Sequence, residues 1–377
     1  MANTISNSAL RPKLWQKALV KNVKDNLYFS KFMGAGEENI IQIKDDLKKE
    51  RGDTITLPIT YKLSSDGVVG DAELEGNEEA ITAYSDSISI DQVRNGVRTT
   101  GEFDEQTNVY DMRNDNKNKL SMWAQEFLER QFFMKLGGVN NLTLTDVAGN
   151  VVGGRAAWAN APEQVPTADT GLGYGDRYLC ADYADGADSL DATDLLTPEL
   201  ISLAKIKAGQ KQSDGAPKMR PLMINGKSHY VMFIHPWQAN DLKNNATYAQ
   251  AQRDAQARGN DNPIFTGALG MWDNVIIHEH EYVPYLDVSE AGYNFNSADA
   301  GTIFGGGTVD CFRALLCGAQ AGVFANTSKS FMMREKDFDY GNKVGYSTGI
   351  IGGVDKVTFN EKDYGVLALD TAATAIV

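Results

Sequence analysis

RGDTITLPITYKLSSDGVVGDAELEGNEEAITAYSDSISID, residues 51–91, contains two runs with the alternation of a half-buried strand, separated by a long acidic segment. Pro58 removes one ladder hydrogen bond and is typical of an edge strand. Hairpin loops normally close in about two to five residues. This stretch therefore predicts a projecting two-stranded finger, which must lie on another surface because a lone hairpin is only marginally stable. Its apolar side chains are Ile55, Leu57, Ile59, Ile88 and Ile90.

A long helix is predicted after the finger, over residues 107–136. Leu120, Trp123 and Phe127 recur at three-and-four spacing and form one apolar stripe, whereas charged residues such as Glu129 fall between them. Two consecutive glycines at 137 and 138 supply the stop. A helix of about 28 residues would span roughly 40 Å, so it is expected to act as a strut.

The remainder of the chain mixes helices and strands. Thr197 and Pro198 predict a helix start, and Gly209 its end. The Asn225–Gly226 pair between apolar runs predicts a hairpin, followed by a buried strand over 230–234 and a short helix from Pro236. Residues 271–284 and 311–326 each resemble one more core strand, and 354–371 a closing strand pair. Because no strand–helix–strand rhythm is present, the fold class is predicted to be α+β.

The charge is unevenly distributed along the sequence. Thirty-six basic and 50 acidic residues give a net charge of −14, which argues against nonspecific adhesion to nucleic acid or anionic membranes. The first 24 residues, in contrast, contain no acid. This basic arm either docks an acidic partner or forms a solvated amphipathic helix, and its cations are Arg11, Lys13, Lys17, Lys21 and Lys24.

Cysteine usage and hydropathy indicate where the protein is made. Cys180, Cys311 and Cys317 form no CxxC pair, and an odd number of cysteines suits buried, reduced thiols. No apolar run approaches the roughly 18 residues of a membrane helix, and the first residues lack the apolar centre of a secretory signal. Production in the cytoplasm is expected.

His278 and His280, each followed by a glutamate, form the only cluster in the sequence that resembles a metal site. A zinc site needs a third ligand and supporting partners, and the remaining histidines, His229 and His235, lie far away in sequence. The sequence also lacks the GxSxG and HExxH patterns and a phosphate loop with its lysine. A structural role is therefore favoured, and no catalytic, cofactor-binding or metal residue is predicted.

Three stretches together resemble one protein family. GNDNPIFTGALGMWDNVIIHEHEYVP (259–284), RGDTITLPI (51–59) and KDYGVLALDTAA (362–373) are similar to stretches of the major capsid proteins of tailed bacteriophages, in the podophage-related subfamily. The resemblance covers essentially the whole chain. It implies the Hong Kong 97-type capsid fold, with an N-arm, an extended loop, a spine helix and peripheral and axial domains.

The resemblance also implies a division of the chain. The expected segments are an N-arm (1–50), an extended loop (51–100), a peripheral domain with the spine helix (101–189), a mainly axial domain (190–325) and a return to the peripheral domain (326–377). The finger would then bury its apolar face on a neighbouring subunit, and the basic arm would face the inside of the shell.

The function implied by the resemblance is that of a non-enzymatic virion protein. Copies of the chain would assemble as pentamers and hexamers into an icosahedral head shell around double-stranded DNA, which they would contact loosely. A separate scaffolding protein, a portal and a decoration protein are the other partners implied. Two alternatives stay open: an encapsulin-like shell around a protein cargo, and a metal-dependent hydrolase using His278 and His280.

Overall fold

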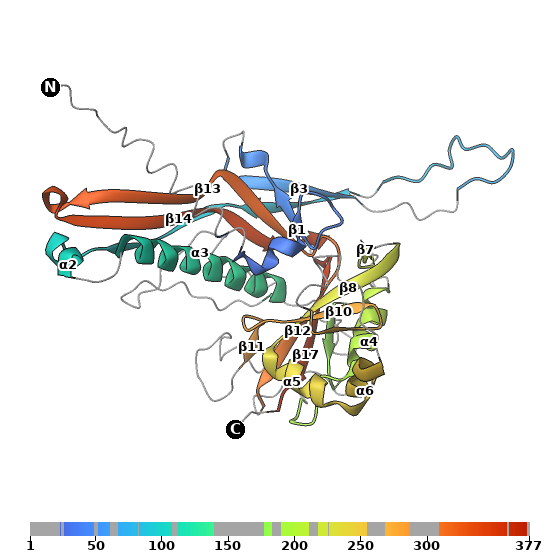
Figure 1. Cartoon of the computed structure of the whole chain (residues 1–377). Helices are drawn as coiled ribbons and strands as arrows, with labels where there is room; N and C mark the ends of the chain where they lie inside the picture. Colours follow the sequence, from blue (N-terminus) through green and yellow to red (C-terminus); the bar gives the residue numbers. More distant parts are fainter. Residues whose placement is uncertain are drawn as a thin grey trace.

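The protein is described by a computed structural model that covers residues 23, 26–48, 52–60, 67–81, 83–107, 112–138, 177–182, 190–210, 218–224, 226–254, 268–286, 309–359 and 362–374. Two layers form the body, an elongated one above and a compact one below, and a thin loop projects to the right (Figure 1). The mixture of helices and sheets agrees with the predicted fold class. In the described residues, no helix is long and apolar enough to cross a membrane.

The upper layer is a five-stranded sheet with one long helix on one face (Figure 1). The centre of this sheet is the antiparallel pair of β13 (Gly322–Phe338) and β14 (Lys343–Lys356), which extends as a long ribbon to the left. The strands, in spatial order, are β1 (Met33–Gly34), β2 (Ile41–Lys44), β13 (Gly322–Phe338), β14 (Lys343–Lys356) and β5 (Asp91–Arg98). The short helices of this layer are η1 (Tyr28–Phe32), η2 (Asp46–Lys48), α2 (Glu102–Thr107) and η4 (Asp339–Gly341).

The long helix is α3 (Met112–Gly137), close to its predicted bounds. Leu120 and Phe127 of the predicted stripe are buried, and Trp123 is half-buried against the same core. The helix stops where Gly138 takes a left-handed φ of 65°, a conformation that costs glycine little. Glu129 departs from the prediction: its side chain is buried, and its Oε1 accepts a 2.8 Å hydrogen bond from the N–H of Tyr28.

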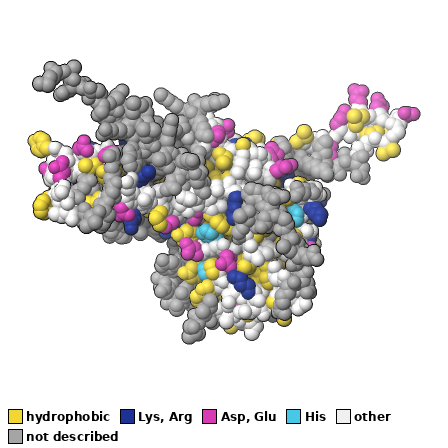
Figure 2. Space-filling model, in the orientation of Figure 1, with side chains coloured by type: hydrophobic (Ala, Val, Ile, Leu, Met, Phe, Trp, Pro, Cys, Tyr) yellow, Lys and Arg dark blue, Asp and Glu magenta, His cyan; other side chains and the backbone are white. Residues whose placement is uncertain are grey.

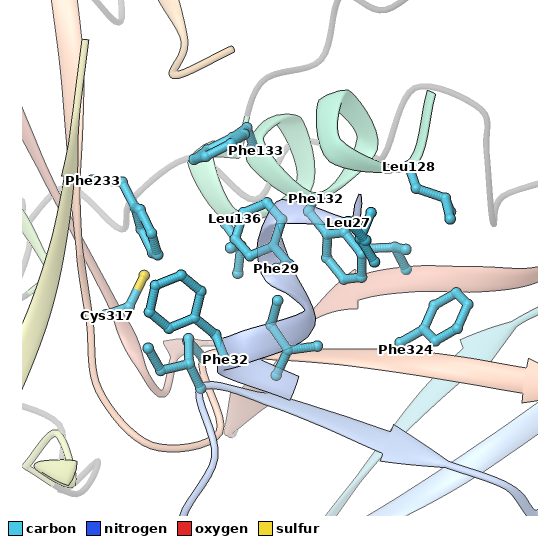
Figure 3. Close-up of a cluster of buried hydrophobic side chains, with 14 of the residues drawn as sticks. Leu27, Phe29, Phe32, Leu128, Phe132, Phe133, Leu136, Phe233, Cys317 and Phe324 are labelled. Carbon is cyan, nitrogen blue, oxygen red and sulfur yellow. The ribbon is translucent and has the colours of Figure 1, made fainter. Parts of the chain in front are cut away.

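An aromatic core ties the two layers together (Figure 3). Phe29 and Phe32 of η1 lie between α3 and the lower sheet. The ring centroid of Phe29 is 4.7 Å from that of Phe133 on α3, and that of Phe32 is 5.2 Å from that of Phe233 on β8. The end of the N-terminal segment is thus part of the core rather than a separate arm.

Truncating the α3 stripe tests this packing. We expect Phe127→Ala to lower the free energy of unfolding by about 3–5 kcal/mol, because a fully buried ring leaves a cavity. Trp123→Ala is the matched control: its half-buried indole stacks on Phe127 with centroids 5.6 Å apart, so its loss should cost clearly less. Urea denaturation measures both, and equal stability of Phe127→Ala and wild type would contradict the packing.

The lower layer is an eight-stranded sheet with helices beside it (Figure 1). Its main path is β6 (Tyr178–Cys180), β17 (Val366–Ala372), β12 (Cys311–Cys317), β8 (Lys227–Ile234), β10 (Val275–Glu279) and β9 (Gly270–Trp272). Two short strands attach to it, β11 (Tyr285–Leu286) to β12 and β7 (Leu222–Ile224) to β8. The helices are α4 (Pro198–Ala208), α5 (Pro236–Asn244) and α6 (Ala246–Asp254).

Local sequence signals in this layer are confirmed. The N–H of Leu200 bonds to the hydroxyl of Thr197 at 3.4 Å, so Thr197 is the N-cap of α4. Strands β7 and β8 form the predicted hairpin, with Gly226 at a φ of 76°.

Two strand predictions need correction. Residues 311–326 are not one strand but β12 of the lower sheet and the start of β13 of the upper sheet. The end of the chain does not return wholly to the upper layer, because β17 lies between β6 and β12 in the lower sheet. Every residue of β17 is buried, as a central strand requires. The small pair β15 (Thr358–Phe359) and β16 (Lys362–Asp363) precedes it.

A buried ion pair fixes the lower sheet to the end of α3. Arg313 on β12 donates to both carboxylate oxygens of Asp370 on β17, at 2.8 and 2.7 Å. Its third hydrogen bond, 2.9 Å long, goes to the carbonyl of Gly137, the last residue of α3. One guanidinium therefore satisfies a sheet carboxylate and a helix terminus together.

Candidate subunit-contact surfaces

The predicted finger is the hairpin of β3 (Thr54–Thr60) and β4 (Ala83–Ser89), which pair antiparallel from Thr54↔Ser89 to Thr60↔Ala83. Pro58 is exposed on β3, where its missing N–H costs nothing. Residues 90–98 leave the finger, because β5 pairs with β14 in the upper sheet. The expected extended loop of 51–100 is thus a hairpin followed by a strand of the body.

The apolar face of the hairpin packs on the protein's own body, which corrects the prediction for these side chains. Ile55, Leu57, Ile59 and Ile88 are buried, with Ile90 beside them, against Val323, Ala325, Val357, Phe359 and Tyr364. Asp86 of β4 also accepts hydrogen bonds from the N–H and hydroxyl of Thr358, at 2.8 and 3.0 Å. The five side chains are too few for a core alone, but β13 together with Val357, Phe359 and Tyr364 completes it. The subunit itself therefore already covers the apolar side chains of the finger, so a neighbouring subunit does not bury them.

The part of the finger that leaves the body is the loop of residues 67–81, which we call the acidic loop (Figures 1 and 2). It carries five carboxylates and no lysine or arginine; these are Asp71, Glu73, Glu75, Glu78 and Glu79. Val69, Leu74 and Ile81 are 84%, 59% and 66% exposed. Sequence reasoning missed these three because they are scattered through an acidic, glycine-containing segment without a strand or helix period. A loop with exposed large apolar side chains and a uniform charge is suited to contact another molecule.

A second exposed end lies at the opposite extremity, where η4 closes the β13–β14 ribbon (Figure 1). Tyr340 there is fully exposed and has a φ of 53°, and Phe103 on neighbouring α2 is 83% exposed. The N–H of Glu102 donates to the side chain of Asn342 at 3.3 Å, which holds α2 against the turn. The molecule thus has two distant ends with exposed apolar groups.

The histidine pair lies in the aromatic core. His278 is fully buried on β10, and its ring is 5.2 Å from that of Phe32. The ring of His280 is 4.5 Å from Tyr28 and 4.6 Å from Phe133. The described residues contain no group of three potential metal ligands. These contacts explain the pair as packing residues of the aromatic core.

Burial sets the protonation of His280. It lowers the pKa of His280 to about 4, and nearby Lys31 acts in the same direction. Burial also raises the pKa of Glu129, whose Oε2 is 3.7 Å from Nε2 of His280. At neutral pH the imidazole is therefore uncharged, and this contact is not an ion pair. His235, at the start of α5, likewise has a pKa lowered by burial to about 4.

These two histidines predict a loss of stability in acid. Both have folded-state pKa values near 4 and an ordinary value of 6.5, so the unfolded chain binds more protons between these limits. The stabilisation that comes from these neutral histidines should be fully present above pH 6.5. The free energy of unfolding should then fall toward pH 4, by about 1–2 kcal/mol per histidine at pH 5. Glu129 partly offsets this loss of stability just above its own ordinary pKa. Burial raises its pKa, so the folded protein binds this proton more readily than the unfolded chain and gains stability as the pH falls.

Urea denaturation at pH 7 and pH 5 measures the effect. His280→Gln should reduce the pH dependence without abolishing it, because burial also lowers the pKa values of His235 and His229. A wild-type stability that does not change between the two pH values would contradict burial of the neutral histidines.

The other residues singled out in the sequence are the three cysteines, which pack in the interior, and the cations of the basic arm. Cys180, Cys311 and Cys317 are buried and free of disulfides, and burial raises the pKa of the Cys180 thiol to about 12, which makes it unreactive. The cations of the basic arm lie outside the described residues: Arg11, Lys13, Lys17, Lys21 and Lys24.

Comparison with known proteins gives one consistent result. Residues 3–375 match the sequence profile of a family described as phage capsid protein. The major capsid protein of Pseudomonas phage KPP25 is 29% identical over 375 residues, or 96% of this chain and 94% of that protein. The capsid of Ralstonia phage GP4 matches with a TM-score of 0.76 at 27% identity and covers 92% of this chain and 91% of its own. The cyanophage Pam1 capsid asymmetric unit has a TM-score of 0.68 at 22% identity, over 92% of each chain.

Proposed function

The chain belongs to the phage capsid protein family and is a major capsid protein of a phage head shell, and on this premise we propose which of its surfaces join the subunits. The observation that carries the proposal is the acidic loop. It extends from a hairpin whose base is anchored in the body, yet its own apolar side chains have no cover (Figure 2). In a shell, the next subunit provides that cover.

The parts of the subunit are proposed to correspond to those of the Hong Kong 97-type fold. The five-stranded sheet with α3 as its spine would be the peripheral domain, and the eight-stranded sheet with α4, α5 and α6 the axial domain. The hairpin β3–β4 with the acidic loop would be the extended loop. Arg313 would link these two domains, since its hydrogen bond to the carbonyl of Gly137 ties the end of α3 to the lower sheet.

Copies of the chain associate with each other in the shell, and the further partners are proposals. Pentamers and hexamers would build the lattice around double-stranded DNA, with a scaffolding protein, a portal and a decoration protein as additional components. The basic arm, Arg11 to Lys24, would face inward, because it is the segment whose charge suits phosphate or an acidic scaffold. The chain would be made in the host cytoplasm before it enters the virion.

Sedimentation tests the proposed function. Expressed with the scaffolding protein of its phage, the chain should sediment as particles of megadalton size, because weak contacts multiply across a closed lattice. Nucleic acid inside mature particles would support a head shell, whereas a protein cargo would indicate an encapsulin-like compartment. A chain that remains monomeric under all these conditions would contradict the proposal.

A further inference from the structure

Asn95 and Gly96 form an asparagine–glycine pair in the middle of β5. The side-chain amide of an asparagine has a carbonyl carbon, Cγ, that the backbone nitrogen of the following residue can attack. Glycine obstructs this attack least, because it has no side chain. The pair therefore supplies both reacting groups of a spontaneous change in the chain, and the backbone of β5 decides whether they meet.

The nitrogen of Gly96 lies on the free edge of the upper sheet. Within the described residues, β5 is the last strand of this sheet and pairs with β14 alone. An edge strand directs the N–H groups of alternate residues away from its neighbour. Gln92 and Gly96, four residues apart, are both exposed, and each donates its N–H to the side chain of the residue before it, at 2.7 and 2.8 Å. Attack by the nitrogen of Gly96 therefore does not require the loss of a bond to β14.

The side chain of Asn95 is turned toward this nitrogen. Its Oδ1 accepts the hydrogen bond from the N–H of Gly96, so the nitrogen is in contact with the amide group that it would attack. Five other asparagines use their amide groups in hydrogen bonds to groups other than the next N–H, and each is followed by a residue larger than glycine: Asn39, Asn77, Asn245, Asn326 and Asn342. Asn95 combines the permissive neighbour with the reactive geometry.

We propose that Asn95 is a site of spontaneous deamidation in the folded protein, a property of the subunit that goes beyond its function in a shell. The nitrogen of Gly96 gives its proton to hydroxide and bonds to Cγ of Asn95. The side-chain nitrogen takes a proton from water and leaves as ammonia, and a five-membered succinimide remains. Water then opens this ring. Opening at Cγ yields aspartate, and opening at the backbone carbonyl carbon yields isoaspartate, in which the main chain runs through Cβ and Cγ.

Both products change the edge of the upper sheet. Asn95 is half-buried and lies opposite Thr348 of β14, on the face that also holds Tyr346 and Ile350. Aspartate places a carboxylate beside this core, where a charge loses part of its hydration. Isoaspartate adds one carbon to the main chain of β5, so the pairs on its two sides no longer share one register with β14. Deamidation should therefore loosen the pairing of β5 with the sheet.

Mass spectrometry of the purified full-length chain tests the proposal. The folded chain is kept at pH 8.5 for about two weeks and then cleaved after glutamate, which releases residues 80–102 with Asn95 as their only asparagine. We expect this peptide to gain about 1 Da at Asn95 and to separate into an aspartate and an isoaspartate form. The isolated peptide, aged in the same way, is the positive control for the chemistry. A peptide that stays unmodified in the folded chain would overturn the proposal, because the fold would then protect the pair.

Urea denaturation of the aged chain measures the structural consequence. We expect the aged wild-type chain to unfold at a lower urea concentration than the fresh one. Asn95→Gln is the matched control: it keeps an amide at this position, but its longer side chain would have to close a six-membered ring, which forms far more slowly. This variant should keep its midpoint when it is aged in the same way. An equal loss in both chains would place the damage elsewhere and contradict the weakening of β5.

Discussion

Replacing residues 61–82 by Asn-Gly is expected to leave a folded subunit and to abolish closed shells. Thr60 pairs with Ala83 in the hairpin register, so a two-residue turn joins the strands without a shift. The acidic loop is almost wholly exposed, and its hydrogen bonds are local, as between the N–H of Asn77 and the carbonyl of Leu74. Its removal therefore takes little from the subunit's own core, while each subunit loses a contact that recurs throughout the lattice.

Circular dichroism and electron microscopy of the same preparation decide this prediction. We expect a melting temperature within a few degrees of wild type and no closed particles. The control replaces residues 61–82 by a Gly/Ser segment of equal length, and it should also fail to assemble if the chemistry of the loop matters as well as its reach. An unfolded product would place the loop in the subunit core, and normal shells would show that it joins no subunits.

The second large effect is expected from the buried ion pair. Arg313→Met should lower the free energy of unfolding by about 3–5 kcal/mol, because it leaves the carboxylate of Asp370 buried without its partner. The change also removes the donor to the carbonyl of Gly137 at the end of α3. Both the cohesion of the lower sheet and its attachment to the spine helix should suffer.

A double-mutant comparison separates charge from packing. Arg313→Met combined with Asp370→Leu removes both charges and should recover much of the loss, since a buried ion pair and an apolar pair of similar volume are often nearly equivalent. Recovery should be incomplete, because the carbonyl of Gly137 stays without its donor. Urea denaturation of the two single variants and the double variant measures the coupling. Equal stability of wild type and Arg313→Met would contradict the central role of this arginine.

Local signals explain why much of the fold was predictable. Thr197, Pro198 and Gly209 place the ends of α4 because capping depends on a few neighbouring residues. The Asn225–Gly226 pair determines its hairpin in the same way. The long β13–β14 ribbon was not predicted, since its outward residues are glycines and charges that hide the usual alternation. Its pairing depends on partners distant in sequence.

The contact surfaces show where sequence reasoning ends. The apolar residues of the finger strands pointed correctly to a hairpin, but what covers them, Val323 and Phe359 among others, is decided by the tertiary structure. The cations on the outward face of the upper sheet have no linear signal, because Arg94 and Arg334 are brought to one face only through their common neighbour β14. The sequence predicted a solvated charge at Glu129, yet its side chain is buried and accepts a hydrogen bond from the N–H of Tyr28.

The central claim is that this chain builds a closed shell in which the acidic loop joins one subunit to the next. Electron cryomicroscopy of assembled particles tests it most directly, because one reconstruction shows both the shell and the neighbours of each segment. The account predicts a closed shell in which residues 67–81 of every subunit lie against another copy of the chain. A closed shell in which these residues touch only their own chain, or point into solvent, would contradict it.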